Sequence, residues 1–358
     1  MAVVHQILPN LEYGDAISNY AILLRRVLRS MGHRSRLYVC HIHPKFYFQA
    51  WPFKAIQRLA KNEDITWIYH YSIGSEITQI ARNLLGRIVL LFHNITPPLL
   101  TVQAQSHLTS YSHAGLEDLK TIIALPRVAI GSSEYNRAQL AKIGFRNTDV
   151  LPVVLDYARF DRPAKRSIVS AYRDGGVNFL TVGRIVPHKK IEDVIRIFHY
   201  YHECINPHSR LFVVGDPKGM EAYQARLIQL CRALNLSNVH FTGKVRFREL
   251  LSYYRIADVY LCMSEHEGFC VPLLECMYLG VPIIANLCTG IGETMGDAGI
   301  LVRQKRFDEI AEMAHLLISD KDLRARVIQK QKERTRFYSE EHLVRQLNAI
   351  LVKAQRNS

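Results

Sequence analysis

The sequence lacks the features that mark membrane-spanning and disulfide-stabilised proteins. Its longest apolar stretches, such as Ile88–Phe92, fall far short of the ~20 residues that a membrane helix needs. Its cysteines number seven, which is odd, and no two of them have CxxC spacing. A disulfide framework and a zinc site are therefore not expected, and a reducing cytoplasm is the compartment that fits best.

Targeting and repeat signals are missing as well. The first residues, MAVVHQILPN, contain no basic stretch followed by an apolar stretch and a small-residue cleavage site. We therefore expect no secretory signal. The chain shows no repeat of fixed period, no low-complexity segment and no aromatic RNA-reading motif among its basic residues, so a nucleic-acid partner is not expected.

Acidic residues are outnumbered, which leaves the chain with a formal net charge of +14 and a pI of about 9.5. A field of this sign favours phosphates, anionic lipid surfaces or nucleic acid, and a generally basic surface is the alternative reading. Hydrophobic residues make up 48% and charged residues 22%, as in ordinary globular proteins. With 358 residues, the chain is long enough for about two domains.

Short apolar runs alternate with amphipathic stretches in both halves, which predicts β-α-β units and parallel sheets. A first domain is expected over residues 1–155, followed by a polar, basic linker over 156–175. The second domain is expected over 176–338, and a final helix over 339–358 could pack back on the first domain. Strands are predicted at Val3–Leu8, Arg36–Cys40, Thr66–Tyr69, Ile88–Phe92, Val128–Gly131, Phe179–Val182, Leu211–Val214, Val239–Thr242, Val259–Met263 and Pro282–Ala285. Helices are predicted at Ala16–Met31, Glu76–Leu84, Leu116–Ile123, Glu134–Ile143 and Glu340–Lys353.

The strongest chemical signal is the segment 264–285, SEHEGFCVPLLECMYLGVPIIA. It follows a predicted buried strand, and Pro272 stands where a helix would begin. Ligands of open α/β sheets bind beyond the carboxyl ends of the strands, and the amides at a helix start suit a diphosphate. Glu267 in the loop and Glu275 in the first helical turns can accept hydrogen bonds from sugar hydroxyls. Two surface glutamates that flank a helix start are the alternative.

A second signal is the segment 182–190, VGRIVPHKK, which follows the first strand of the second domain. Gly183 lets the backbone turn close to a ligand. Arg184 offers a planar fork for phosphate, and Lys189 offers a compact charge. Fixed cations of this kind stabilise the charge that develops on a diphosphate leaving group, so they can replace a metal ion. A solvated basic loop is the alternative.

These two segments resemble the E-x7-E and G-R-x-x-P-x-K signatures of family 4 of the retaining glycosyltransferases. The resemblance implies the GT-B fold, in which two Rossmann-like domains face each other across a cleft and the C-terminal helix packs back on the first domain. It implies that Glu275 holds the donor ribose and that Arg184 and Lys189 hold the diphosphate. The transferred sugar would lie against Glu267 and the backbone of Gly268, Phe269 and Cys270, and the phosphates would meet amides near Val271, Pro272, Leu273 and Leu274.

In the first domain the resemblance is weaker. The Gly14–Asp15 turn stands where the family has a glycine-rich loop that approaches the donor, but this chain has one glycine there, and Asp15 could instead cap the following helix. His93, in the strand-end segment LFHNITPP, resembles the cleft histidine that contacts the sugar. Gly292-Glu293-Thr294 resembles a P-E-T turn beside the nucleotide, with glycine in place of the proline.

The resemblance implies transfer of a hexose such as mannose or glucose from a GDP- or UDP-linked donor to a saccharide or lipid-linked acceptor, with retention of configuration. Such an enzyme would act in cell-surface polysaccharide or glycolipid synthesis. Neither a metal nor another cofactor is expected, and no D-x-D carboxylate cluster follows a predicted strand. Contact with the inner face of an anionic membrane would suit the net charge of +14. A nucleotide-sugar epimerase or hydrolase of the same fold, and a basic nucleic-acid-binding protein, are the alternatives.

Overall fold

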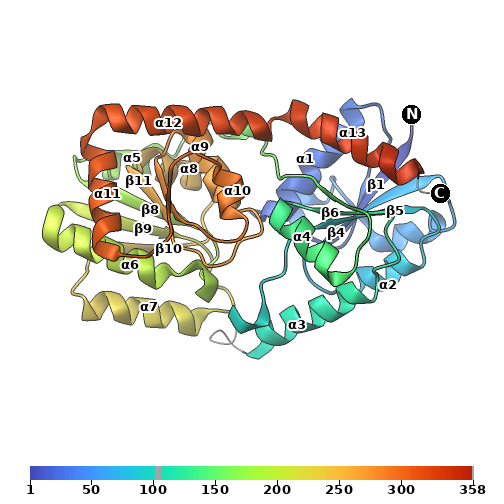
Figure 1. The fold of residues 1–358 in the computed structure, drawn as a ribbon, viewed down its shortest axis with the longest axis horizontal. Coiled ribbons are helices and arrows are strands. Elements are labelled where there is room, and N and C mark those ends of the chain that lie inside the picture. The colour runs from blue at the N-terminus through green and yellow to red at the C-terminus, as the bar shows by residue number, and fades with distance from the viewer. Residues whose placement is uncertain (101–105, 357–358) are drawn as a thin grey trace. The chain divides into compact units, whose positions relative to one another are not determined.

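A computed structural model describes residues 1–100 and 106–356 of the chain. The chain divides into two compact units, each built on its own sheet (Figure 1). Met1–Pro98, Ser110–Leu155 and the C-terminal segment from Tyr338 onward form the first unit, and Asp156–Phe337 forms most of the second. Both sheets are parallel and carry helices, which confirms the predicted α/β fold with two Rossmann-like domains.

The first unit is a seven-stranded sheet in the order β3-β2-β1-β4-β5-β6-β7. Its central strands are nearly continuous apolar runs, as expected for strands that are covered on both faces. Trp67, Tyr69 and Tyr71 of one strand are fully buried in the core. The elements are β1 (Val3–Leu11), α1 (Ala16–Ser30), β2 (Leu37–Ile42), β3 (Trp51–Pro52), β4 (Ile65–Tyr71), α2 (Ile77–Arg82), β5 (Arg87–Phe92), α3 (Ser106–Lys120), β6 (Val128–Gly131), α4 (Glu134–Ile143), β7 (Thr148–Val150) and α13 (Glu340–Arg356).

The second unit is a six-stranded sheet in the order β10-β9-β8-β11-β12-β13. Its core joins apolar residues of β8, β9 and β11 to the buried faces of α6 and α11, including Phe179, Phe198 and Leu261. The elements are α5 (Arg166–Ala171), β8 (Val177–Val182), α6 (Ile191–Tyr200), β9 (Ser209–Val214), α7 (Glu221–Ala233), β10 (Val239–Gly243), α8 (Phe247–Ile256), β11 (Val259–Cys262), α9 (Val271–Leu279), β12 (Ile283–Asn286), α10 (Ile291–Met295), β13 (Ile300–Val302), α11 (Phe307–Ser319) and α12 (Lys321–Thr335).

The last helix, α13, returns to the first unit, where it contacts β5 and β6. Leu343, Leu347 and Leu351 recur at four-residue spacing and are buried on its inner face. An ion pair of 3.1 Å between Lys353 Nζ and Asp149 Oδ2 joins its last turns to the β7 strand. Within the described part of the chain, every helix is too short or too polar to cross a bilayer.

Several local predictions differ from the structure. The helix predicted at Leu116–Ile123 instead runs over Ser106–Lys120 as α3, because the helix as a whole is only weakly amphipathic and gives little periodic signal. The polar segment 156–175 is partly helical. Its helix α5 packs on α8, and the Lys165 amide donates to Ser252 Oγ at 2.8 Å. The polar composition of this segment therefore indicated the boundary between the two units but gave no sign of the packed helix α5.

Each sheet contains a point at which the strand order reverses, and ligands of such sheets bind beyond the carboxyl ends of the strands at that point. In the first sheet it lies between β1 and β4, and in the second between β8 and β11. The loops that leave these strands are therefore the first places to look for a site.

Candidate active site

The loops after β8 and β11 meet at the switch point of the second sheet. Lys189 ends a short 3₁₀ turn, Pro187–Lys189, that follows β8, and Glu267 lies in the loop between β11 and α9. Since β8 and β11 are hydrogen-bonded neighbours, their carboxyl ends bring the two side chains to one edge of the sheet. The two motifs that stood out in the sequence thus converge at one place.

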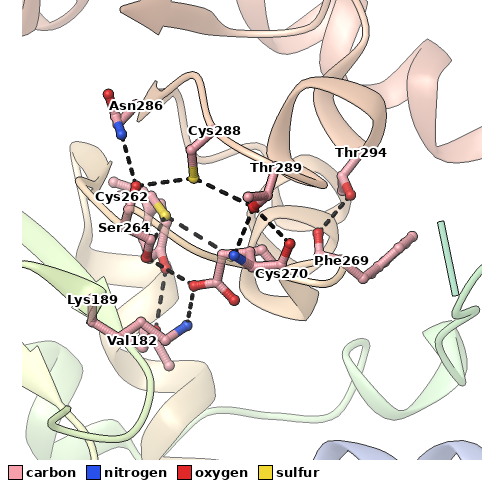
Figure 2. Close-up of polar contacts among 12 residues, drawn as sticks. Val182, Lys189, Cys262, Ser264, Phe269, Cys270, Asn286, Cys288, Thr289 and Thr294 are labelled. Carbon is pink, nitrogen blue, oxygen red and sulfur yellow. Dashed lines mark hydrogen bonds and ion pairs between the residues drawn. The ribbon is translucent and has the colours of Figure 1, made fainter. Parts of the chain in front are cut away.

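Lys189 and Glu267 form an ion pair there (Figure 2). Lys189 Nζ lies 2.5 Å from Glu267 Oε1, and Ser264 Oγ donates to the same oxygen at 2.8 Å. The two charged side chains are 18% and 11% exposed, so water screens them little. Burial opposes both charges, but the attraction between the partners outweighs it: the pKa of Lys189 is raised and that of Glu267 is lowered. Both groups are therefore ionised at neutral pH.

A glycine makes room for this lysine. Gly183, which directly follows β8, has φ +147°, and a Cβ added there would lie 3.3 Å from Lys189 Cε. Any larger residue would strain the backbone and press against the stem of Lys189. Gly183 therefore acts on the charge pair by leaving space beside it.

The loop that carries Glu267 is held by the last residue of β12 and by residues of the segment that follows it (Figure 2). Thr289 Oγ1 bridges the backbone of Glu267, since it accepts from the N–H and donates to the carbonyl, each at 2.8 Å. Asn286 Nδ2 donates to the Ser264 carbonyl at 2.8 Å, and Thr294 Oγ1 donates to the Phe269 carbonyl at 2.5 Å. Thr294 belongs to the segment that resembles a P-E-T turn, and here it positions the loop rather than a ligand.

Helix α9 begins at Val271, one residue before Pro272, so proline occupies the first turn as predicted. Cys270 caps it in the left-handed conformation, with φ +72°. The positive end of the α9 dipole lies beside the buried residues Gly268, Phe269 and Cys270, and an anion that reached this turn would be stabilised. Val271, Pro272 and Leu273 form the first turn itself.

Glu275 lies one turn further along α9. The Tyr254 hydroxyl of α8 donates a short hydrogen bond to its Oε2 atom. Burial raises the pKa of the Glu275 carboxyl, although Tyr254 and the charge of Arg159 oppose that rise. Glu275 is thus held by a different element from Glu267, and it is not part of the Lys189 ion pair.

The other cations of the basic loop behave differently from Lys189. Arg184 is exposed, and its guanidinium forms no hydrogen bond or ion pair with the residues that the structure describes. Lys190 Nζ lies 3.4 Å from Glu265 Oε2 and 3.7 Å from Glu192 Oε1. The lysine that follows Lys189 is therefore engaged at the surface, whereas Arg184 is available to a ligand.

A potential set of metal ligands lies under the same loop. One ligand atom from each of Cys262, Glu267 and Cys270 falls within 4.8 Å of the others. Glu267 already pairs with the Lys189 ammonium, which would repel a divalent cation at that oxygen. The cluster therefore fits a metal poorly, because a fixed protein cation occupies its carboxylate.

The residues predicted in the first unit follow β1 and β5. Gly14 has φ +80°, and Asp15 caps helix α1, with its Oδ2 atom accepting from the Ser18 amide at 2.8 Å. The capping alternative for Asp15 is therefore what the structure contains. His93 directly follows β5, at the same edge of the sheet.

His93 is half-buried and ends a hydrogen-bonded relay through the buried His70 and Gln6, which the sequence did not reveal. Its Nε2 atom lies 2.9 Å from His70 Nδ1, and His70 Nε2 lies 2.8 Å from Gln6 Oε1. Burial lowers the pKa of His93 to about 3, and burial together with His93 lowers that of His70, so both rings are neutral at pH 7.

The relay sets the tautomer of His93. Gln6 Nε2 donates to the Ala21 carbonyl, which leaves Gln6 Oε1 as the acceptor for His70 Nε2–H. His70 Nδ1 must then accept, and His93 Nε2–H donates to it. Nδ1 of His93 is left unprotonated, so it can accept a hydrogen bond from a hydroxyl group.

The structure brings Lys189, Gly183 and Glu267 together, with Gly268, Phe269 and Cys270 in the same loop. Arg184 directly follows Gly183, and Glu275 lies on α9 with Tyr254 as its partner. Gly14, Asp15 and His93 belong to the first unit. Sequence reasoning missed Ser264, Thr289, Tyr254, His70 and Gln6. Their roles come from contacts between segments far apart in the chain, and no local motif announces them.

Comparisons with known proteins find similarity to a glycosyltransferase family. Residues 167–334 match the family described as glycosyl transferases group 1. A trehalose synthase from Pyrococcus horikoshii is 28% identical over 253 residues, which cover 68% of this chain and 55% of that protein. The chain spans about half the length of the first curated relatives that it matches.

Two further similarities bear on ligands and fold. A GDP-mannose-dependent monoacylated alpha-(1-6)-phosphatidylinositol monomannoside mannosyltransferase from Corynebacterium glutamicum is 24% identical over 222 residues, or 60% of this chain and 50% of that protein. The structure of Anabaena HepE in complex with UDP and glucose has a TM-score of 0.77 at 16% identity, over 98% of this chain and 100% of HepE. At so low an identity, the structural likeness shows only the fold, which is the GT-B fold.

Proposed function

Because residues 167–334 form a glycosyl transferases group 1 domain, we propose that this protein is a metal-independent, retaining hexosyltransferase with a nucleotide diphosphate sugar as donor. The observation that carries the proposal is the ionised Lys189–Glu267 pair at the switch point between β8 and β11. It offers a cation for the diphosphate and an acceptor for sugar hydroxyls at the edge of the sheet where such ligands bind.

Each charge has a part in the proposed reaction. The bond between the anomeric carbon and the phosphate oxygen breaks, and negative charge develops on the leaving diphosphate. Lys189, together with the exposed Arg184, stabilises that charge without a metal ion. Glu267 accepts hydrogen bonds from the sugar, and Ser264 and Lys189 keep its carboxylate ionised and oriented.

Retention follows if the acceptor hydroxyl attacks on the face from which the diphosphate leaves. The acceptor oxygen bonds to the anomeric carbon, and its proton passes to an oxygen of the departing diphosphate. Glu275 holds the donor ribose. On the first unit, Gly14 and the backbone of Asp15, whose side chain caps α1, form a donor-binding turn. His93 accepts a hydrogen bond from a substrate hydroxyl through Nδ1.

We propose GDP-mannose or a UDP-hexose as the donor and a saccharide or lipid-linked acceptor, in cell-surface polysaccharide or glycolipid synthesis. The name of the Corynebacterium relative, which specifies GDP-mannose and a phosphatidylinositol mannoside, supports a lipid-linked acceptor. The net charge of +14 supports peripheral contact with an anionic membrane on the cytoplasmic side. Vesicle binding that weakens as salt is added would support this contact, and no binding at low salt would refute it.

The deciding experiment is a turnover and thermal-shift screen against a panel of GDP- and UDP-sugars and candidate acceptors, with and without EDTA. We expect one nucleoside diphosphate to stabilise the protein and turnover to persist in EDTA. The anomeric configuration of the product, read by NMR, should match that of the donor. A strict metal requirement or an inverted product would refute the mechanism.

A matched pair of variants tests the ribose site. Glu275→Ala should abolish turnover, because it removes the carboxylate that holds the ribose. Tyr254→Phe removes the hydrogen bond to that carboxylate but keeps the carboxylate itself, and should retain most of the activity. Wild-type rates in Glu275→Ala would exclude Glu275 from the donor site.

A further inference from the structure

The amino ends of the first sheet carry a pocket that the proposed reaction does not use. Its volume is about 380 Å³, which is within the roughly 300–1,000 Å³ typical of small-molecule sites. Val3 and Ile65, the first residues of β1 and β4, lie in its wall, together with residues of the segment between α1 and β2. The candidate substrate residues Gly14 and His93 follow the carboxyl ends of the strands, so this pocket lies at the opposite edge of the same sheet.

The lining of this pocket is basic. Arg29, Arg34 and Arg36 contribute to it along with His5 and His33, and no acidic residue is among the lining residues identified in the described chain. Arg29 comes from the last turn of α1, where the helix dipole adds about half a negative charge. Three guanidinium groups outweigh that partial charge, so the pocket carries a net positive field.

These arginines are only partly engaged by protein. Arg29 Nε donates to the Ser35 carbonyl at 3.0 Å, and the Arg36 guanidinium lies 4.6 Å from the centre of the Trp51 ring. Arg34 is exposed, and its side chain forms no hydrogen bond or ion pair within residues 1–100 and 106–356. Most N–H donors of these guanidinium groups are therefore available to a phosphate, which planar, paired donors suit.

A buried hydroxyl in the wall of the pocket has no hydrogen-bond partner in the described structure. Ser35 lines the pocket, is 3% exposed, and its Oγ atom has no hydrogen-bond partner in the described structure. Buried hydroxyl groups are rarely left unpaired, because the loss of hydrogen bonds to water is not compensated. Rotation of the Ser35 side chain toward the pocket would let a bound oxyanion accept this hydrogen bond while it neutralises the arginines.

We propose that this pocket binds a phosphate-bearing anion, at a site separate from the one that binds the donor diphosphate. The shared chemistry is a phosphate group with at least one further negative charge, from a soluble phosphorylated compound or from an anionic lipid headgroup. His5 can serve as a probe of the site, because it lines the pocket and is uncharged at neutral pH. Burial and the neighbouring Arg36 and Arg34 lower the pKa of His5 to about 4.

The test follows the His5 ring resonance by NMR in protein labelled at histidine, with the signal assigned by its loss in His5→Asn. Inorganic pyrophosphate is added as the soluble probe. A bound anion offsets the arginines, so it should shift the His5 signal and raise the pH at which His5 titrates. Pyrophosphate at the donor site would leave this signal unchanged, which keeps the two sites distinguishable.

Variants then separate a specific pocket from general basic charge. Arg34→Ala should weaken pyrophosphate binding at His5 about tenfold, as expected for one charge-assisted contact, and Ser35→Ala should weaken it by a smaller factor. Arg146→Ala removes the same charge from an exposed position on the same unit and should change binding less than twofold.

The source of the phosphate is decided by a parallel sedimentation assay. The probes are phosphatidylcholine vesicles with and without phosphatidic acid, whose phosphomonoester can carry a second negative charge. Arg34-dependent binding to the anionic vesicles identifies a lipid headgroup, whereas an Arg34-dependent His5 shift with pyrophosphate alone identifies a soluble ligand. The proposal fails if neither probe responds to Arg34→Ala, or if Arg146→Ala weakens binding as much as Arg34→Ala does.

Discussion

The two sheets bury polar side chains at their carboxyl edges in opposite ways. In the second unit Lys189 and Glu267 stay ionised, because each stabilises the charge of the other at 2.5 Å. In the first unit His70 and His93 are neutral, because burial without a counter-charge disfavours the protonated rings. A buried site thus avoids an uncompensated charge either by pairing charges or by giving up protons.

This difference determines which chemistry each unit can perform. The charged pair can respond to a leaving diphosphate, while the neutral relay can only offer a directed lone pair to a hydroxyl. It also predicts different sensitivities to acid. The pKa of His93 is about 3 in the folded protein against an ordinary 6.5. As the pH falls below about 6.5, this histidine is therefore protonated in the unfolded chain before it is in the folded protein, and the free energy of unfolding decreases. Glu267, whose pKa is lowered from 4.5, loses its stabilising contribution only below that value.

The largest effect should come from breaking the charged pair. Lys189→Ala leaves Glu267 buried without its partner, which should cost about 3 kcal/mol of unfolding free energy at pH 7. Turnover should fall about a thousandfold, since the cation that faces the leaving group is lost. Urea unfolding at pH 7 and pH 4 checks this, and the penalty should shrink at pH 4 as Glu267 takes up a proton.

The control for this variant is Lys190→Ala. Its partner Glu265 is 39% exposed, so the unfolding free energy should fall by less than about 1 kcal/mol. Equal losses in the two lysine variants would contradict the distinction between a buried and a surface pair.

The next effect tests the space beside the lysine. Gly183→Ala places a Cβ 3.3 Å from Lys189 Cε at a φ of +147°, so the lysine must shift and turnover should drop about a hundredfold. Gly175→Ala is the matched control, because Gly175 also has a positive φ, +87°, but a Cβ there would meet nothing within 4 Å. Turnover of both variants at saturating donor measures the difference, and equal rates would mean that backbone strain alone is at work.

The relay of the first unit should respond more weakly. His70→Phe removes the acceptor for His93 Nε2–H, so both tautomers of His93 become populated and kcat should fall about tenfold. Nitrogen NMR shifts should show a protonated Nε2 in the wild type and a mixture in the variant. His70→Gln keeps an acceptor and should recover part of the rate.

The pH dependence of stability sharpens the same comparison. Because the folded-state pKa of His93 is lowered, its contribution is complete above pH 6.5 and is lost as the pH falls toward about 3. The double variant His70→Phe/His93→Phe should therefore flatten the decline in unfolding free energy between pH 6.5 and pH 4.5. An unchanged slope would mean that the histidines are not buried in neutral form.

The smallest effect should come from the support behind Glu267. Thr289→Val removes the hydroxyl that bridges the Glu267 N–H and carbonyl, which should cost about 1–2 kcal/mol and slow turnover several-fold. Thr289→Ser keeps the hydroxyl and should behave almost as the wild type. Donor KM should rise more than kcat falls, because the loop that holds the sugar is loosened.

Much of the fold was predictable from local patterns. The alternation of apolar runs with amphipathic stretches placed both parallel sheets, and the β6 strand Val128–Gly131 and the α4 helix Glu134–Ile143 have the predicted bounds. Pro272 marked the start of α9 because proline suits the first helical turn. The edge strands β3, β7 and β13 were missed, since two or three residues are too few to show a period.

The candidate site likewise has a part that local patterns predicted and a part that they did not. Residue types at short spacing pointed to Lys189 in one segment and to Glu267 and Glu275 in another, because a motif is a local pattern. Whether side chains touch is decided by the sheet order, and Ser264, Thr289 and His70 acquired their roles only there. Their partners come from separate loops and strands.

By itself, the amino-acid sequence determined that this chain forms two parallel α/β units and that its second half carries acids and cations after strand ends. It could do so because strand and helix periodicity, proline position and charge are properties of neighbouring residues. Only the tertiary structure decided that Lys189 pairs with Glu267 while Lys190 does not, and that His93 is neutral with a single tautomer. Those outcomes depend on burial and on partners that lie far away along the chain.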